Sequence, residues 1–196
     1  MSPADRSRRP RTAAADVPML LIAAGRKILE RDGVAGLTVR TAASEAGVAP
    51  MGVYNHFGGK DGLLDAVVTD GFREFSRAIA ANDDAPLVRL LASGRAYREF
   101  ALANPVLYSL MFSHDCAPAD DAARGAFDVL VDVIRYGQVG GVIEAGDPES
   151  LAMRVWSCVH GAVSLELGSA YPPDLDGAGN YENVMVLVAR GLAPQH

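Results

Sequence analysis

Three short helix-forming stretches, separated by glycines, occupy residues 17–60 and constrain the fold more than any other feature of this sequence. Apolar side chains recur at helical spacing in the first stretch, and Gly33 closes it. Thr38 can cap a second, alanine-rich helix, which Gly47 can end in the left-handed conformation. The pattern therefore predicts two helices joined by a tight turn.

A third helix follows almost at once. Pro50 takes the favoured first position of a helix that runs to about Phe57. Gly58 and Gly59 stop it, and a longer helix starts near Lys60. Three short helices ahead of a long fourth one predict a helix-turn-helix.

The rest of the chain is helical by pattern, and no segment alternates as a strand would. Breaks that carry Pro, Gly or Asx predict helices at about 60–81, 86–103, 105–113, 119–142, 148–170 and 180–192. The predicted class is all-α, with a flexible basic arm at residues 1–16, a helix-turn-helix domain at 17–60 and a second helical domain at 61–196.

Charge is distributed unevenly along the chain. The net charge of −6 is made up of +4 over residues 1–60 and −10 over residues 61–196, so a polyanion would meet the first third. No apolar run approaches the ~20 residues of a membrane span, and the two cysteines fit neither a disulfide scaffold nor a zinc site. We expect a soluble, cytoplasmic protein.

The predicted third helix has distinct faces. Val53 and Phe57 share an apolar edge that is expected to face inward. The remaining positions are Met51, Gly52 and Asn55 opposite that edge and Tyr54 and His56 on its two flanks. This arrangement suits a helix in the major groove, with outward residues at the base edges, flanking residues at the phosphates and Gly52 allowing a close approach. The alternative is a small bundle with ordinary half-exposed Tyr and His side chains.

The run LTVRTAASEAGVAPMGVYNHFGGKDGLLDAVV resembles the DNA-binding region of TetR-type transcriptional regulators. The resemblance covers about residues 18–66 and implies that a set of residues contacts operator DNA, namely Thr38, Arg40, Thr41, Met51, Gly52, Tyr54, His56 and Lys60. Ala49 departs from the family, which commonly has a capping Ser or Thr there. Loss of that cap weakens a helix by ~1 kcal/mol.

The segment WSCVHGAVSLEL resembles a ligand-binding subtype known for a Trp-x-x-x-His-Gly motif. That resemblance implies a regulatory domain that dimerises through its last two helices, which begin near Glu149 and Asn180. Trp156, His160, Val163 and Leu167 form one helical stripe, which fits core packing and pocket lining equally well. Gly161 is expected to permit close helix packing.

A regulator needs a second site for an effector, and aromatic and Met residues at helical spacing are its candidates. The predicted ligand-binding residues are Phe75, Tyr97, Phe100, Tyr108, Met111, Phe112, Phe127, Trp156 and His160, with Phe72 and Tyr136 as further candidates. Such a pocket is largely apolar, with Tyr97, Tyr108 or His160 as polar anchors. Drug-like, lipid-like and aromatic molecules all fit this lining.

Three alternatives remain. A helical hydrolase would use Cys158 or Ser157 with His160, or the loop with His114, Asp115 and Cys116; neither has a nucleophile elbow. A metal-responsive regulator would use His114, Asp115, Cys116 and His160. A helical interaction module would have lost DNA binding. The preferred prediction is a homodimeric repressor of a near-palindromic operator, released by a small molecule, without catalytic residues, metal or cofactor.

Overall fold

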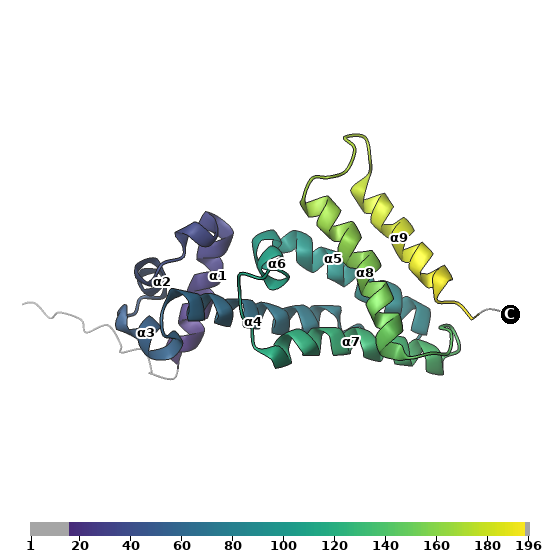
Figure 1. Ribbon diagram of the computed structural model, residues 1–196, viewed down its shortest axis with the longest axis horizontal. Helices are drawn as coiled ribbons and strands as arrows, with labels where there is room; N and C mark the ends of the chain where they lie inside the picture. Colours follow the sequence, from purple (N-terminus) through teal and green to yellow (C-terminus); the bar gives the residue numbers. More distant parts are fainter. Residues whose placement is uncertain (1–15, 195–196) are drawn as a thin grey trace, which may run out of the picture. The chain divides into compact units, whose positions relative to one another are not determined.

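The computed structural model describes residues 16–194, and helices are the only regular secondary structure in that range. This confirms the all-helical class. The described chain divides into two compact units, and the division lies between Val67 and Val68, inside α4 (Lys60–Ile79) (Figure 1). All of the basic arm except Asp16 lies outside the described residues.

The first unit contains α1 (Val17–Gly36), α2 (Val39–Ala46), α3 (Met51–Phe57) and the start of α4. Its core consists of fully buried apolar side chains, among them Leu21, Ile28, Leu37, Val53 and Leu63. The predicted break at Gly33 is confirmed, because this residue has non-helical angles of φ 66° and ψ −170°. The chain then makes one more turn to Gly36 before α2 begins.

The second unit contains the rest of α4 followed by α5 (Pro86–Ala103), α6 (Pro105–Met111), α7 (Asp120–Val139), α8 (Pro148–Leu167) and α9 (Gly177–Gly191). α5 packs against α7, α8 and α9, and the last two helices lie side by side (Figure 1). Two ion pairs hold α5 in place: Arg98 binds Glu166 of α8, and Arg95 binds Glu182 of α9.

Several helix ends differ from prediction by two or three residues. α9 begins three residues early because the Asp176 carboxylate accepts a hydrogen bond from the Ala178 N–H at 3.1 Å. α7 ends at Val139 rather than 142, ahead of Gly141 in the left-handed conformation (φ 70°). α8 ends at Leu167 rather than 170, ahead of Ser169 at φ 52°. The ends of α4 and α6 each come two residues early. Every helix in residues 16–194 is too short or too polar to cross a bilayer.

Candidate functional site

Two threonines close the N-terminus of α2. Thr38 Oγ1 accepts a hydrogen bond from the Thr41 N–H at 3.0 Å, and Thr41 Oγ1 accepts one from the Thr38 N–H at 2.9 Å. Gly47 ends the helix at φ 68°. The predicted threonine cap and left-handed glycine are both confirmed. Arg40 is exposed in the first turn and forms no ion pair with a described residue, so its guanidinium is available to an external anion.

α3 has one buried face and one exposed face. Val53 is fully buried, whereas Met51 and Tyr54 are 62% and 54% exposed. His56 is also exposed. Phe57, which was expected to be buried with Val53, is only half-buried because it occupies the last position of this short helix. The outward surface is therefore built by polar and large apolar side chains with nothing of this unit packed over them.

The N-terminus of α3 has no side-chain cap, as Ala49 leads one to expect. The Gly52 N–H instead donates to the Ala49 carbonyl at 2.9 Å, and the Val53 N–H donates to the Pro50 carbonyl at 3.1 Å. The helix begins at Met51, so the prediction that Pro50 is its first residue is wrong by one position. Pro50 already has helical angles, φ −53° and ψ −30°, but it precedes the first residue of regular helix.

Gly52 lies closer to α1 than the sequence suggested. A Cβ at this position would lie 3.5 Å from Val17 Cγ1 and 3.9 Å from Leu21 Cδ1. These are ordinary van der Waals distances, so an alanine would fit. The role of Gly52 in a close approach to DNA stays a prediction, and Gly52→Ala tests it without disturbing the fold.

Glycines build the junction between α3 and α4. Gly58 and Gly59 have φ values of 74° and 148°, which confirms that they end the helix. Gly62 was not singled out from the sequence, yet a Cβ there would overlap the Phe57 carbonyl oxygen. Gly62 therefore lets the first turn of α4 pack against the end of α3. This contact also fixes where Lys60 starts α4, and Lys60 forms no ion pair with a described residue.

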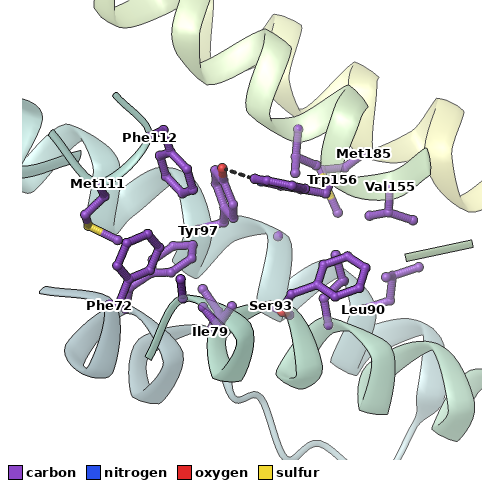
Figure 2. Close-up of a pocket in the computed structure, with 17 residues that line it drawn as sticks. Phe72, Ile79, Leu90, Ser93, Tyr97, Met111, Phe112, Val155, Trp156 and Met185 are labelled. Atoms are coloured by element: carbon purple, nitrogen blue, oxygen red, sulfur yellow. Dashed lines mark hydrogen bonds between the residues drawn. The ribbon is translucent and has the colours of Figure 1, made fainter. Parts of the chain in front are cut away.

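The second unit encloses a cavity of about 250 Å³ (Figure 2). Helices α4 to α9 all contribute to its wall, and the described residues that line it include no Asp, Glu, Lys, Arg or His. Six of the nine predicted ligand-binding residues line this cavity, together with Phe72: Phe75, Tyr97, Met111, Phe112, Phe127 and Trp156. The structure thus brings together residues that are up to 81 positions apart in the predicted set.

A hydrogen-bonded cluster lies on one side of the cavity. The Trp156 indole N–H donates to the Tyr97 hydroxyl oxygen at 3.2 Å (Figure 2). The hydroxyls of Tyr97 and Tyr108 are 2.9 Å apart, and both lie within 3.0 Å of His160 Nδ1. Burial lowers the pKa of His160, raises that of Tyr97, and raises that of Tyr108 to about 12. All three groups are therefore neutral near pH 7, with Nδ1 accepting from a tyrosine.

Three of the predicted ligand-binding residues do not line the cavity. Tyr108 and His160 lie behind Tyr97 in the hydrogen-bonded cluster. Phe100 packs on Phe75, with ring centroids 5.1 Å apart. The further candidate Tyr136 is also elsewhere: its hydroxyl donates to the Asp84 carbonyl at 2.8 Å. These side chains pack against the lining residues or bond a neighbouring turn, and they do not line the cavity.

Sequence reasoning missed the small and flexible members of the wall. Ser93 and Gly94 lie one turn before Tyr97 on α5, and Met185 reaches the cavity from α9. A Cβ on Gly94 would meet Sδ of Met185 at 2.6 Å, so glycine makes room for that side chain. The i, i+4 spacing of Ser93 and Tyr97 was a usable indication. Nothing local pointed to Met185.

Two family models match the chain. The model of bacterial regulatory proteins of the tetR family matches residues 21–67, and the Tetracyclin repressor-like C-terminal domain matches residues 90–187, half of the sequence. The chain belongs to the TetR family of bacterial regulatory proteins. It is therefore a DNA-binding transcriptional regulator, and the resemblance seen in VYNHFGGK is confirmed at the level of the family.

Individual proteins similar to this chain include transcriptional regulators. The HTH-type transcriptional regulator Rv1816 of Mycobacterium tuberculosis is 25% identical over 202 residues, covering 84% of this chain and 86% of its own. The uncharacterized HTH-type transcriptional regulator Rv0681 of the same organism is 29% identical over 176 residues, covering 84% and 76%. A solved Rhodococcus sp. RHA1 protein of unknown function has a TM-score of 0.81 at 30% identity, covering 95% of this chain and all of its own.

The residues suggested for a hydrolase or a metal site are not assembled. Ser157 Oγ donates to the Met153 carbonyl at 2.8 Å, and His160 Nδ1 is engaged with tyrosines. Cys158 is exposed on α8. Among residues 16–194, no group of three or more His, Cys, Asp or Glu side chains is placed to hold a metal ion.

Four large apolar side chains of α8 and α9 are exposed. They are Met153, Leu165, Val186 and Leu187, which are between 44% and 65% exposed. Residues of the two helices also line a hollow of about 520 Å³. Gly161 lies in this hollow, and a Cβ on it would meet nothing within 4 Å, so no described residue of the chain packs closely on it. Its role in close helix packing stays a prediction.

Proposed function

We propose that this TetR-family regulator is a ligand-responsive repressor that binds a near-palindromic operator as a homodimer and is released by a small molecule. The observation that carries the proposal is the exposed surface of α3. Met51, Tyr54 and His56 project from a helix whose opposite side is anchored by buried Val53. We assign operator binding to residues 17–60 and effector binding to residues 61–196.

Different residues of α3 are assigned to different parts of the DNA. Met51, which is 62% exposed at the start of this helix, is assigned to base edges in the major groove. Tyr54 and His56 are assigned to the phosphates on either side, and Lys60 adds an ammonium group at the start of α4. Thr38, Arg40, Thr41 and Gly52 complete the proposed contact set. The threonine hydroxyls already cap α2, so their contacts with DNA also depend on that cap.

The hollow lined by α8 and α9 is assigned to the homodimer. Exposed Leu165 on one helix and Leu187 on the other form part of the same hollow. A twofold axis would place this surface against its own copy, as in most homodimers. Leu187→Asp should give monomers in sedimentation velocity, whereas Leu87→Asp, at another exposed leucine, on α5, should leave dimers. Dimers in both variants would place the interface elsewhere.

Effector release is assigned to α4, because one helix carries residues of both proposed sites. Lys60 starts it, and Phe72, Phe75 and Ile79 line the cavity. A ligand that favours one position of this helix in the cavity wall would change the placement of Lys60. The finer assignment to the Trp-x-x-x-His-Gly subtype belongs to this proposal. Its support is that Trp156 lines the cavity while His160 orients Tyr97 behind it.

Selection of bound fragments from genomic DNA tests the function. The full chain should enrich inverted repeats whose half-sites are about one helical turn, ~34–36 Å, apart. Met51→Ala should enrich a different set of half-sites with the fold unchanged, since this side chain is mostly exposed. Enrichment of no fragment, or of single half-sites only, would contradict dimeric operator binding. The same half-sites in both selections would remove Met51 from base recognition.

A further inference from the structure

We propose that the cavity takes an uncharged, compact and mainly apolar molecule that carries one hydrogen-bonding group directed at Ser93. The proposal rests on the assignment of this cavity to the effector. It goes further by naming the chemical class of the ligand and the side chain that selects it.

The lining excludes a charged ligand group. None of the described residues around the cavity is an acid, a basic residue or a histidine. A carboxylate or ammonium group placed inside would lose its hydration and would have no group of opposite charge beside it. Burying an unpaired charge in this way has a large unfavourable free energy. His160 is a titratable residue that could interact with a charged ligand group. However, it lies behind Tyr97, and its Nδ1 is engaged there in hydrogen bonds. The ligand is therefore neutral where it is enclosed.

The polar groups of the wall are few, and two of them are already paired. The Trp156 N–H donates to the Tyr97 hydroxyl, whose oxygen also contacts Tyr108 and His160 Nδ1. This cluster is saturated and gives the ligand little to bind. An incoming polar group would have to break one of those bonds to compete.

Ser93 differs from that cluster. Its side chain is 4% exposed and lines the cavity, and no described residue forms a hydrogen bond with its hydroxyl. Every fully enclosed side-chain nitrogen and oxygen in residues 16–194 has a partner, so the Ser93 oxygen is not fully enclosed, and Ser93 is a lining residue of the cavity. A ligand hydroxyl or carbonyl would give this hydroxyl a hydrogen-bond partner within a mainly apolar wall.

The size of the cavity sets the remaining limit. Its volume of about 250 Å³ lies below the ~300–1,000 Å³ typical of ligand pockets. Six aromatic rings and two methionines surround it: Phe72, Phe75, Tyr97, Phe112, Phe127, Trp156, Met111 and Met185. Such a wall favours a compact ring system over a long chain, because rings and sulfur contact a ring on many sides.

The chain contains a built-in reporter for the test. Trp156 is its single tryptophan and lines the cavity, so tryptophan emission excited at long wavelength reports ligand binding directly. Three probes with one carbon skeleton and no absorbance in this region are titrated at neutral pH: cyclohexylmethanol, cyclohexylmethylammonium and cyclohexanecarboxylate. We expect saturable binding of the alcohol and at least about tenfold weaker binding of both ions.

Variants separate the roles of shape and polarity. Ser93→Ala should weaken the alcohol about three- to tenfold, which corresponds to one hydrogen bond, whereas Ser109→Ala at an exposed position of α6 should not. Ala126→Leu, a change in the wall, should block all three probes, and circular dichroism confirms that each variant is folded. Equal binding of alcohol and ions, an unaffected Ser93→Ala variant, or no binding of any probe to the wild type would each overturn the proposal.

The outcome is distinguishable from failure of the proposed function. Binding of a selected operator fragment is measured by fluorescence anisotropy in the same samples. The double variant Tyr54→Phe, Lys60→Ala should bind the alcohol normally and lose operator affinity. Normal operator binding with no preference for the neutral probe would contradict only the proposed ligand class. Preferential binding of the neutral probe without operator binding would contradict only the proposed repressor function.

Discussion

The indole N–H of Trp156 donates to the hydroxyl oxygen of Tyr97 at 3.2 Å and so ties α8 to α5 across one end of the cavity. The same oxygen lies 2.9 Å from the Tyr108 hydroxyl and 3.0 Å from His160 Nδ1. One buried hydroxyl thus serves three neighbours, and its removal leaves the Trp156 N–H without its acceptor, while Tyr108 and His160 Nδ1 still bond each other.

Tyr97→Phe is expected to lower the free energy of unfolding by about 1–3 kcal/mol, because the Trp156 N–H loses its acceptor in a buried place. Urea unfolding followed by circular dichroism measures this. Tyr54→Phe is the matched control: its hydroxyl is on an exposed ring and bonds no described residue, so the change should be under ~0.5 kcal/mol. Equal losses in the two variants would show that the cluster does not stabilise the fold.

His160 should make stability fall as the pH is lowered. Burial holds its pKa below the ordinary 6.5, so the unfolded chain takes up a proton at higher pH than the folded protein does. Below about pH 6.5 the unfolded state binds more protons, and the free energy of unfolding decreases until the folded pKa is passed. Glu182, whose pKa is lowered by its hydrogen bond to Arg95, titrates below this window.

His160→Gln should therefore flatten the stability profile between about pH 7.5 and 5. His56→Gln, which removes an exposed imidazole, controls for the loss of a histidine. Chemical unfolding at a series of pH values gives both profiles. Parallel curves for the wild type and His160→Gln in this window would rule out His160 as their source.

Gly62→Ala should destabilise the first unit by about 1–3 kcal/mol, because the added methyl group meets the Phe57 carbonyl and the junction must shift. Operator affinity should fall as well, since α3 ends at that carbonyl. Gly125→Ala, in α7 with nothing within 4 Å of the new Cβ, should instead stabilise the protein by ~0.5–1 kcal/mol. Thermal melts and anisotropy titrations measure the two effects; an unaltered Gly62→Ala variant would contradict the close contact.

Tyr54→Phe combined with Lys60→Ala should weaken binding to all DNA sequences and reduce the slope of log K against log salt by about one unit. The loss of the lysine ammonium accounts for the slope, and the loss of the phenol hydroxyl adds to the weaker affinity. Anisotropy titrations over a salt series provide the measurement. A slope equal to that of the wild type would remove Lys60 from the phosphate contacts, and an unchanged affinity would remove Tyr54 as well.

The helices of the first unit were predictable because their ends are decided locally. Thr38 bonds a backbone group three residues away, and Gly47 and Gly58 adopt left-handed angles in the turn where they stand. The one-residue error at Pro50 has the same origin: its angles are helical, but the hydrogen bonds of the neighbouring turn decide where α3 begins. The approach of Gly62 to Phe57 depends on how two helices meet, which no local pattern encodes.

The cavity was predictable only in part for a related reason. Phe100 and Tyr97 are three residues apart on one helix, and both are buried, yet only Tyr97 reaches the cavity. Spacing identifies the buried face of a helix but not which neighbours leave space in front of it. Ser93 shares a helix face with Tyr97, but Met185 contributes only because α9 packs beside α5, which no local pattern predicts.

The contact between Gly94 and Met185 bears on how selective the cavity is. Met185 fills the room that the missing side chain of residue 94 leaves, and its unbranched thioether turns about three bonds. The part of the cavity wall formed by Met185 can therefore change its position by rotation of that side chain. Natural compounds that share a ring and a polar group but differ by a methyl or two should be tolerated alike, which suits a sensor of a compound class more than a sensor of one metabolite.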